Sequence, residues 1–215
     1  WTVTGPKNLA DQIIYLEENL TVAAGGRLSL DNVTLRFNSS ESSALVLEVR
    51  AGGEIVLRNS TLDSNGSWPY LLRALPGSKL SMSGCTISHA GTCATVPELS
   101  GMLVATVQSS IDNTSFSFGA AGLYLWNCSP TVSDCQFLAN GAGLVLDCSN
   151  ASLWRCSFAT DAGWDMLLLN GSVARAVDTD VDPALVEIAD AACSLDVLWS
   201  LTVVVGWDTG RPGAD

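Results

Sequence analysis

A short motif recurs six times along this chain of 215 residues, and this repetition constrains the fold more than any other feature. Each copy joins two apolar residues through a small polar bend. The copies are LDNVTL at 30–35, LRNSTL at 57–62, MSGCTI at 82–87, IDNTSF at 111–116, VSDCQF at 132–137 and LWRCSF at 153–158. Successive copies begin 27, 25, 29, 21 and 21 residues apart. Self-similarity at a period of about 20 to 50 residues is typical of a solenoid.

Within each unit the apolar residues alternate with polar ones and then slip by one position at an Asp, Asn or Gly. Alternation with period two indicates strands, and those three residue types tolerate the left-handed backbone of a bend. An earlier apolar strand, such as the one at 45–49, opens each unit. Three strands per repeat predict an all-β, parallel β-helix of about seven turns with a C-terminal strand.

Equivalent residues of the repeat should stack inside such a coil. One predicted stack is Leu30, Leu57, Met82, Ile111, Val132 and Leu153. The other is Leu35, Leu62, Ile87, Phe116, Phe137 and Phe158.

The run NLTVAAGGRLSLDNVTL at 19–35 resembles the right-handed parallel β-helix repeats, of pectate-lyase-like shape, found in large archaeal cell-surface proteins. The resemblance covers about residues 16–180. It implies a right-handed coil and a cell-surface location. Because proteins with this repeat have many functions, it implies little about activity.

The repeat divides the chain into a coil and a tail. Residues 1–195 are expected to form the β-helix, with an N-terminal cap over 1–15 that covers the exposed strand edges. Residues 196–215 are expected to hold a terminal strand at 197–205 or the start of a truncated immunoglobulin-like module, which WSLTVVVGWDTGRPGA at 199–214 resembles. The connections at 38–44, 64–70 and 88–101 should project on one side.

Charge and hydropathy argue against two classes of partner. The net charge of −12 opposes binding to the phosphate backbone of a nucleic acid. Residues 111–215 hold 3 basic and 13 acidic side chains, which fits either a solvated surface or one that binds divalent cations or a cationic partner. The longest nearly apolar run, 197–207, has 11 residues, whereas a membrane-spanning helix needs about 20. No direct membrane span is therefore expected.

Asparagine gives the strongest indication of location. Nine of the eleven asparagines stand in Asn-x-Ser/Thr, the acceptor motif for N-linked glycans, and only Asn8 and Asn140 do not. The predicted glycosylation sites are Asn19, Asn32, Asn38, Asn59, Asn65, Asn113, Asn127, Asn150 and Asn170. For those at the bend of the repeat, the alternative is an internal asparagine ladder without sugar. We therefore expect an extracellular protein at the cell surface, with N-linked glycans.

Seven cysteines agree with an oxidising exterior. Equivalent residues on stacked turns lie about 4.8 Å apart, within reach of a disulfide. The predicted disulfides are Cys85–Cys93, Cys128–Cys148 and Cys135–Cys156. Cys193 is left over and is predicted to form an intermolecular bridge. The alternative for Cys85, Cys135 and Cys156 is a column of small buried residues.

One cation site is a candidate. Asp178, Asp180 and Asp182 would lie on one face of an extended strand, where mutual repulsion favours a bound Ca²⁺. Pro183 stands where an EF-hand loop needs Gly, so that motif is excluded. The alternative is a set of ordinary turn carboxylates, and no other cofactor is expected.

Catalytic motifs are absent from the sequence. His89 is the only histidine, and it lies between two cysteines that supply too few ligands for a zinc site. No nucleophile elbow, phosphate-binding loop or zinc-protease motif occurs. The candidate residues of a polysaccharide site, which could stack on a sugar and bond to its hydroxyls, are Trp126, Asp147, Asp161, Trp164 and Asp165. The alternative is that the tryptophans pack at the surface against a neighbouring loop or subunit. We predict that the protein is not an enzyme.

These observations predict a secreted, non-enzymatic glycoprotein that is a structural subunit of a cell envelope or extracellular assembly, such as a surface layer, sheath or filament. Its main partner is expected to be further copies of itself. The alternatives are a β-helix that binds or cleaves polysaccharide and an adhesin domain.

Overall fold

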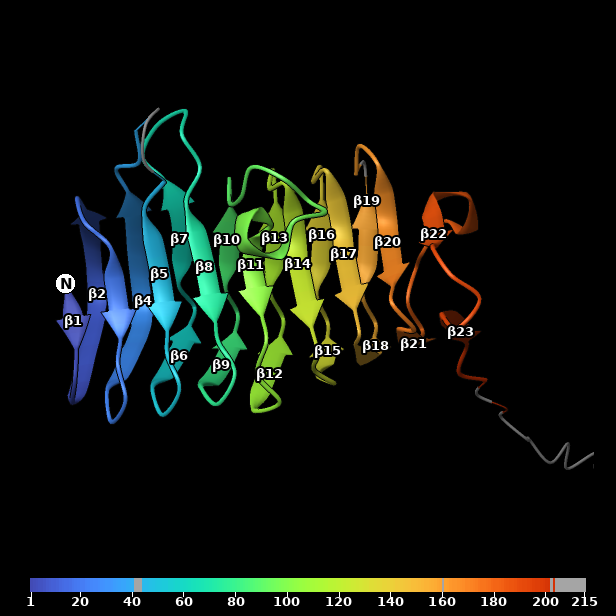
Figure 1. Cartoon of the computed structure of the whole chain (residues 1–215), viewed down its shortest axis with the longest axis horizontal. Coiled ribbons are helices and arrows are strands. Elements are labelled where there is room, and N and C mark those ends of the chain that lie inside the picture. The colour runs from blue at the N-terminus through green and yellow to red at the C-terminus, as the bar shows by residue number, and fades with distance from the viewer. Residues whose placement is uncertain (41–43, 160, 202, 204–215) are drawn as a thin grey trace, which may run out of the picture.

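The computed structural model describes residues 1–40, 44–159, 161–201 and 203. This part of the chain winds into a parallel β-helix of nine turns, which confirms the predicted all-β solenoid. Figure 1 shows the turns side by side along the long axis, from β1 at one end to β22 and β23 at the other. The described helices are two short 3₁₀ segments, η1 (Pro97–Leu99) and η2 (Pro183–Leu185), and neither is long or apolar enough to cross a membrane.

The coil has three sides. One side is a sheet of nine parallel strands, in the order β1 (Thr2–Val3), β3 (Leu20–Val22), β5 (Val46–Val49), β8 (Leu71–Ala74), β11 (Gly101–Val104), β14 (Ala121–Trp126), β17 (Ala142–Asp147), β20 (Trp164–Leu169) and β22 (Val186–Ile188). The other two sides form one sheet of 14 strands, because the long strands β2 (Pro6–Leu16) and β4 (Arg27–Phe37) run through the corner between them.

Beyond β4 the second and third sides have separate strands. The second side consists of β6 (Glu54–Arg58), β9 (Lys79–Ser83), β12 (Ser109–Asp112), β15 (Thr131–Ser133), β18 (Asn150–Trp154), β21 (Val173–Val177) and β23 (Ser194–Leu198). The third side consists of β7 (Thr61–Ser64), β10 (Thr86–Ser88), β13 (Ser115–Ser117), β16 (Gln136–Leu138) and β19 (Ser157–Ala159).

Both predicted apolar stacks are confirmed. The residues of the first, from Leu30 to Leu153, pair in register on the second side and are each at most 1% exposed. The second stack, from Leu35 to Phe158, pairs in register on the third side, where the Phe137 ring lies 5.2 Å from that of Phe116 and 4.7 Å from that of Phe158. These columns form the core of the coil because period-two alternation turns them all inward.

The coil has nine turns rather than about seven because the first, eighth and ninth turns lack the repeated motif. The segment expected as an N-terminal cap is instead the first turn, in which β2 pairs with β4 from Pro6–Arg27 to Leu16–Phe37. At the other end β23 pairs with β21, so Val197 and Leu198 belong to the ninth turn and have partners. Residues 202 and 204–215, with most of the predicted immunoglobulin-like start, lie outside the described residues.

The longest excursion, residues 89–100, folds back over the nine-stranded sheet. Leu103, Tyr124, Val145 and Leu167 face outward from this sheet, yet each is at most 4% exposed, and Ala94 of the excursion packs against their cluster. Figure 1 shows the segment between β10 and β11 lying in front of the sheet. The central strands β14 and β17 are therefore apolar on both faces.

Replacing Phe137 by Ala is expected to lower the free energy of unfolding by about 3–5 kcal/mol, since it opens a cavity between two stacked rings. The neighbouring Leu138 faces outward and is 40% exposed, so Leu138→Ala serves as the matched control, with an expected change below about 1 kcal/mol. Urea unfolding followed by circular dichroism measures both variants. Equal losses would contradict the interior position of the stack.

Candidate functional site

The corner between the second and third sides carries a column of residues with left-handed backbone. Their φ angles lie between 44° and 66°, and they are Asp11, Asn32, Asn59, Gly84, Asn113, Asp134, Arg155 and Asp178. Asn, Asp and Gly are the residues that adopt this conformation most readily. The bend therefore favours Asn, Asp or Gly at the same level of successive turns, and this preference explains why three Asn-x-Ser/Thr sites occur there.

Two pairs of neighbouring side chains in this column are bonded to each other. Asn32 Nδ2 donates to Asp11 Oδ1 at 2.8 Å. Arg155 donates from Nε and Nη2 to the two carboxylate oxygens of Asp134, both at 2.7 Å. This bidentate bond holds an arginine at a bend that rarely accepts one. The Arg155 guanidinium also holds the pKa of Asp134 below its usual value.

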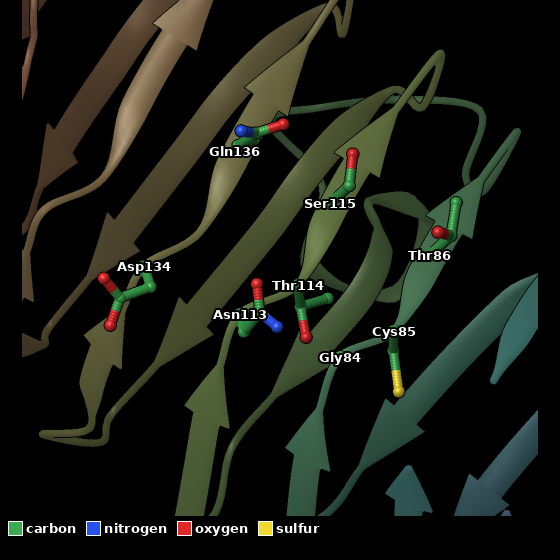
Figure 2. A pocket seen from close by; sticks show the side chains of 8 residues that line it. All are labelled: Gly84, Cys85, Thr86, Asn113, Thr114, Ser115, Asp134 and Gln136. Carbon is green, nitrogen blue, oxygen red and sulfur yellow. The ribbon is translucent and has the colours of Figure 1, made fainter. Parts of the chain in front are cut away.

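A shallow groove of about 270 Å³ opens in the middle of the column. Its lining residues are Gly84, Cys85, Thr86, Asn113, Thr114, Ser115, Asp134 and Gln136, from three consecutive turns (Figure 2). Gly84 creates the opening, because it alone of the eight described column residues has no side chain. A Cβ at Gly84 would lie 2.6 Å from Asn59 Oδ1, so the Asn59 amide leans over the place that a side chain would occupy.

The groove offers hydrogen-bonding groups rather than an acid–base pair. Within the described residues, the side chains of Thr86, Asn113, Ser115 and Gln136 make no hydrogen bond to the protein, so their donors and acceptors face solvent. Asp134 is the carboxylate of the groove, and its lowered pKa keeps it ionised at neutral pH, which suits an acceptor better than a proton donor. Hydroxyl, amide and carboxylate groups together suit a polar ligand such as a sugar.

The nine asparagines of the glycosylation motif all lie at the surface. Asn38 is half-buried and the other eight are exposed. By contrast Asn140, which lacks the motif, is 1% exposed and bonds inside the coil, accepting from the Gly119 amide at 3.0 Å and donating to the Phe116 carbonyl at 3.0 Å. The internal asparagine therefore lies at another corner, and Asn32, Asn59 and Asn113 are not an internal ladder.

The side-chain nitrogens of these nine asparagines fall into two groups. Four of them donate to an oxygen of the protein: Asn32 to Asp11, Asn38 to Glu17, Asn65 to Asn38 and Asn170 to Asp147. The five whose Nδ2 donates to no atom of the described residues are Asn19, Asn59, Asn113, Asn127 and Asn150. The second group presents a free amide to solvent.

All seven cysteines are free thiols in the structure, so the three predicted disulfides are not present in it. Two of the predicted pairs are also misplaced. Cys128 points inward and donates to the Val104 carbonyl at 3.3 Å, whereas Cys148 is exposed at a bend. Cys85 lies in the core and Cys93 in the 89–100 excursion, where its thiol lies 3.6 Å from Thr95 Oγ1.

Cys193 was predicted to bridge two subunits, but its side chain is buried. It is 8% exposed, and its Sγ lies 3.4 Å from Asp190 Oδ2. A thiol in this position is not presented to another molecule. The odd cysteine therefore gives no structural support to an intermolecular bridge.

A column of small hydrogen-bonding residues explains the cysteines of the repeat. Its members follow the left-handed corner and point inward; they are Ser60, Cys85, Thr114, Cys135, Cys156 and Thr179. Each donates its hydroxyl or thiol to the carbonyl oxygen two residues earlier, at 2.7–3.5 Å. Ser, Thr and Cys are exchangeable here because each is small and carries one donor.

The predicted Ca²⁺ ligands are not brought together. Asp178 accepts from the Ser200 amide and hydroxyl, and Asp182 caps η2 by accepting from the Ala184 amide. No group of three or more His, Cys, Asp or Glu side chains in the described part of the chain could hold a metal ion. The alternative of turn carboxylates describes these residues better.

The residues considered for a polysaccharide site are mostly structural. Trp126 and Asp147 share one level of β14 and β17, as predicted, but Asp147 is buried and accepts from the Tyr124 hydroxyl at 2.8 Å. Trp164 packs on the outer cluster of the nine-stranded sheet. His89 directly follows β10 of the third side, where its Nδ1 lies 2.8 Å from Asp63 Oδ1 and its ring stacks on Phe118.

Asp161 and Asp165 form a buried acidic pair. The sequence predicts that they cluster in one loop, but it does not predict their burial. Asp161 Oδ1 accepts from the Asn140 amide at 2.6 Å and from its Nδ2 at 3.1 Å, whereas Oδ2 is buried and has no hydrogen-bond partner among the described residues. Burial raises the pKa of Asp161 to about 6, with a contribution from Asp165, although the Asn140 N–H groups oppose the rise.

Because the folded pKa of Asp161 exceeds the unfolded value of about 3.9, its effect on stability is most favourable below pH 4 and is lost as the pH rises to 6. Asp161→Asn keeps an acceptor for Asn140 and removes the buried charge. We expect it to stabilise the protein above pH 6, by on the order of 2 kcal/mol, and to leave stability at pH 4 unchanged. Thermal unfolding from pH 4 to 8 measures this, with exposed Asp196→Asn as the control.

Comparison with known proteins agrees with this geometry. The family of right-handed β-helix regions matches residues 43–174, which extend from the third to the eighth turn and include the groove at Gly84. A search of curated proteins found no match. The matched region covers more than half of the chain and includes five of the six copies of the repeated motif. The chain therefore belongs to the right-handed β-helix family.

Proposed function

We propose that this protein is a secreted, non-enzymatic glycoprotein that serves as a structural subunit of a cell envelope or extracellular assembly. The observation that carries the proposal is the distribution of asparagine. All nine asparagines of the glycosylation motif lie at the surface, and the fully buried Asn140 lacks the motif. Selection for glycan attachment accounts for this distribution, because a glycan needs a solvent-facing amide.

The shape of the molecule supports a structural role. Stacked turns give long sides and two ends, and the outermost strands β2 and β23 each have one edge without a partner among the described strands. Unpaired edge strands are templates for association. Apolar side chains are exposed at both ends, including Ile13 and Tyr15 on β2 and Val197 and Leu198 on β23. We propose that copies associate through these ends, and the resemblance to archaeal surface repeats agrees with a surface layer, sheath or filament.

A polysaccharide-binding role is the second candidate. The groove at Gly84 favours it, because four unpaired polar side chains and one carboxylate converge there. Cleavage has less support than binding, since the Asp134 carboxylate is held ionised by Arg155. An adhesin domain would use the same surface.

Glycan attachment is expected to follow the state of the asparagine side chains. We expect high occupancy at Asn19, Asn59, Asn113, Asn127 and Asn150, whose amide nitrogens face solvent, and lower occupancy at Asn32, Asn38, Asn65 and Asn170. Peptide mass spectrometry of material from the native host measures occupancy at each site. Peptides without any modification would contradict the proposal, although not the fold.

Assembly is expected to depend on the end of the coil that carries β23. A chain without residues 196–215 loses Val197 and Leu198 but retains the first eight turns, so it should keep most of its circular dichroism spectrum, whereas the 215-residue chain should form oligomers or polymers. Light scattering after size-exclusion chromatography compares the two at high concentration, with and without Ca²⁺. If the complete chain stays monomeric in both conditions, the structural role fails and polysaccharide binding becomes the better explanation.

A further inference from the structure

Cys135 and Cys156 lie side by side in the inward column of the corner. Their following residues, Gln136 and Ser157, pair in register, and the Ser157 amide donates to the Cys135 carbonyl at 3.0 Å. Both side chains point into the coil and are 0% and 2% exposed. The two residues thus occupy the same level of the sixth and seventh turns.

The two thiols are close enough to influence each other's acidity. The neighbouring thiol raises the pKa of Cys135 and lowers that of Cys156. Each thiol also lies near the carbonyl two residues earlier, at 3.1 Å for Cys135 and 3.5 Å for Cys156.

Among the other cysteines of the described residues, Cys148 and Cys193 also interact, but Cys148 is exposed and Cys193 is buried. In the same column Cys85 stands between Ser60 and Thr114, neither of which carries a thiol. The Cys128 amide donates to Ser149 Oγ of the next turn, so Cys128 is level with a serine. Cys93 lies in the 89–100 excursion, Cys148 is exposed at a bend and Cys193 is buried beside Asp190.

We propose that Cys135 and Cys156 close into a disulfide during folding and that the folded coil then protects this bond from reductants. The oxidant is a small disulfide such as oxidised glutathione. The Cys156 thiolate attacks it and releases one thiol; the Cys135 thiolate then attacks Cys156 Sγ and releases the second. Two protein thiols lose two protons and two electrons, and the oxidant disulfide becomes two thiols.

Burial determines when this chemistry takes place. In the folded coil both sulfur atoms are inaccessible, so the exchange must precede closure of the sixth turn on the seventh. Once the column has closed, the same burial excludes a reductant. Whether the pair is a disulfide or two thiols is therefore decided by the redox conditions during folding. This inference does not depend on the extracellular function proposed above.

Refolding the complete reduced chain with oxidised and reduced glutathione tests the proposal. Alkylation under denaturing conditions and peptide mapping should then find Cys135 linked to Cys156 and the other five cysteines alkylated. Dithiothreitol should leave the link intact in the folded protein and break it in urea. Recovery of Cys135 and Cys156 as alkylated thiols, or linkage of either to another cysteine, overturns the proposal.

Serine variants provide the matched comparison, because serine already occupies this column at Ser60. Cys135→Ser should fold, lose the linked peptide and have a urea midpoint that does not change with reduction. Cys85→Ser should keep the link and a midpoint that falls after reduction in urea. Equal midpoints for oxidised and reduced wild-type protein would contradict a bond between the two turns. The experiment supplies the oxidant, so its result does not depend on where the protein is found. A negative result would therefore not contradict the proposed extracellular function, and a protein without that function could still form the disulfide.

Discussion

In-register pairing between successive turns is the interaction on which the whole structure depends. Parallel strands place each residue directly beside its equivalent on the next turn. Equivalent positions therefore share one environment and accept similar residue types along the coil. Leu30 lies beside Leu57, and Leu57 beside Met82. The apolar stacks, the polar corner and the surface rows are all consequences of this one register, and a change at one level affects mainly its two neighbours.

The corner between the second and third sides shows how the register limits composition. Its outward residues need left-handed backbone, which selects Asn, Asp and Gly, and its inward residues need a small donor, which selects Ser, Thr and Cys. Glycosylation motifs and cysteines thus arise partly from bend geometry. Position on the outer or inner side separates the two cases: Asn113 is exposed to solvent, whereas Cys135 is enclosed.

The fold could be predicted from the sequence because the spacing of the repeated motif determines which residues pair between successive turns. The apolar stacks were identified to the residue, whereas the first and last turns were missed because β2 and β23 lack the motif. The pairing of Cys128 with Cys148 failed through an offset of one position, which reverses the direction of a side chain. The groove at Gly84 could not be predicted either, because it arises from a missing side chain between turns that are distant in sequence.

The excursion over the nine-stranded sheet also affects how the coil opens. Strands β14 and β17 have the interior on one face and the cluster of Leu103, Tyr124 and Val145 on the other. Apolar side chains therefore shield their backbone hydrogen bonds from solvent on both faces. The ends of a solenoid fray first, since terminal turns have a neighbour on one side only. Amide hydrogens in β14 and β17 should therefore exchange last, and the sixth and seventh turns form the unit that persists when the rest of the coil has opened.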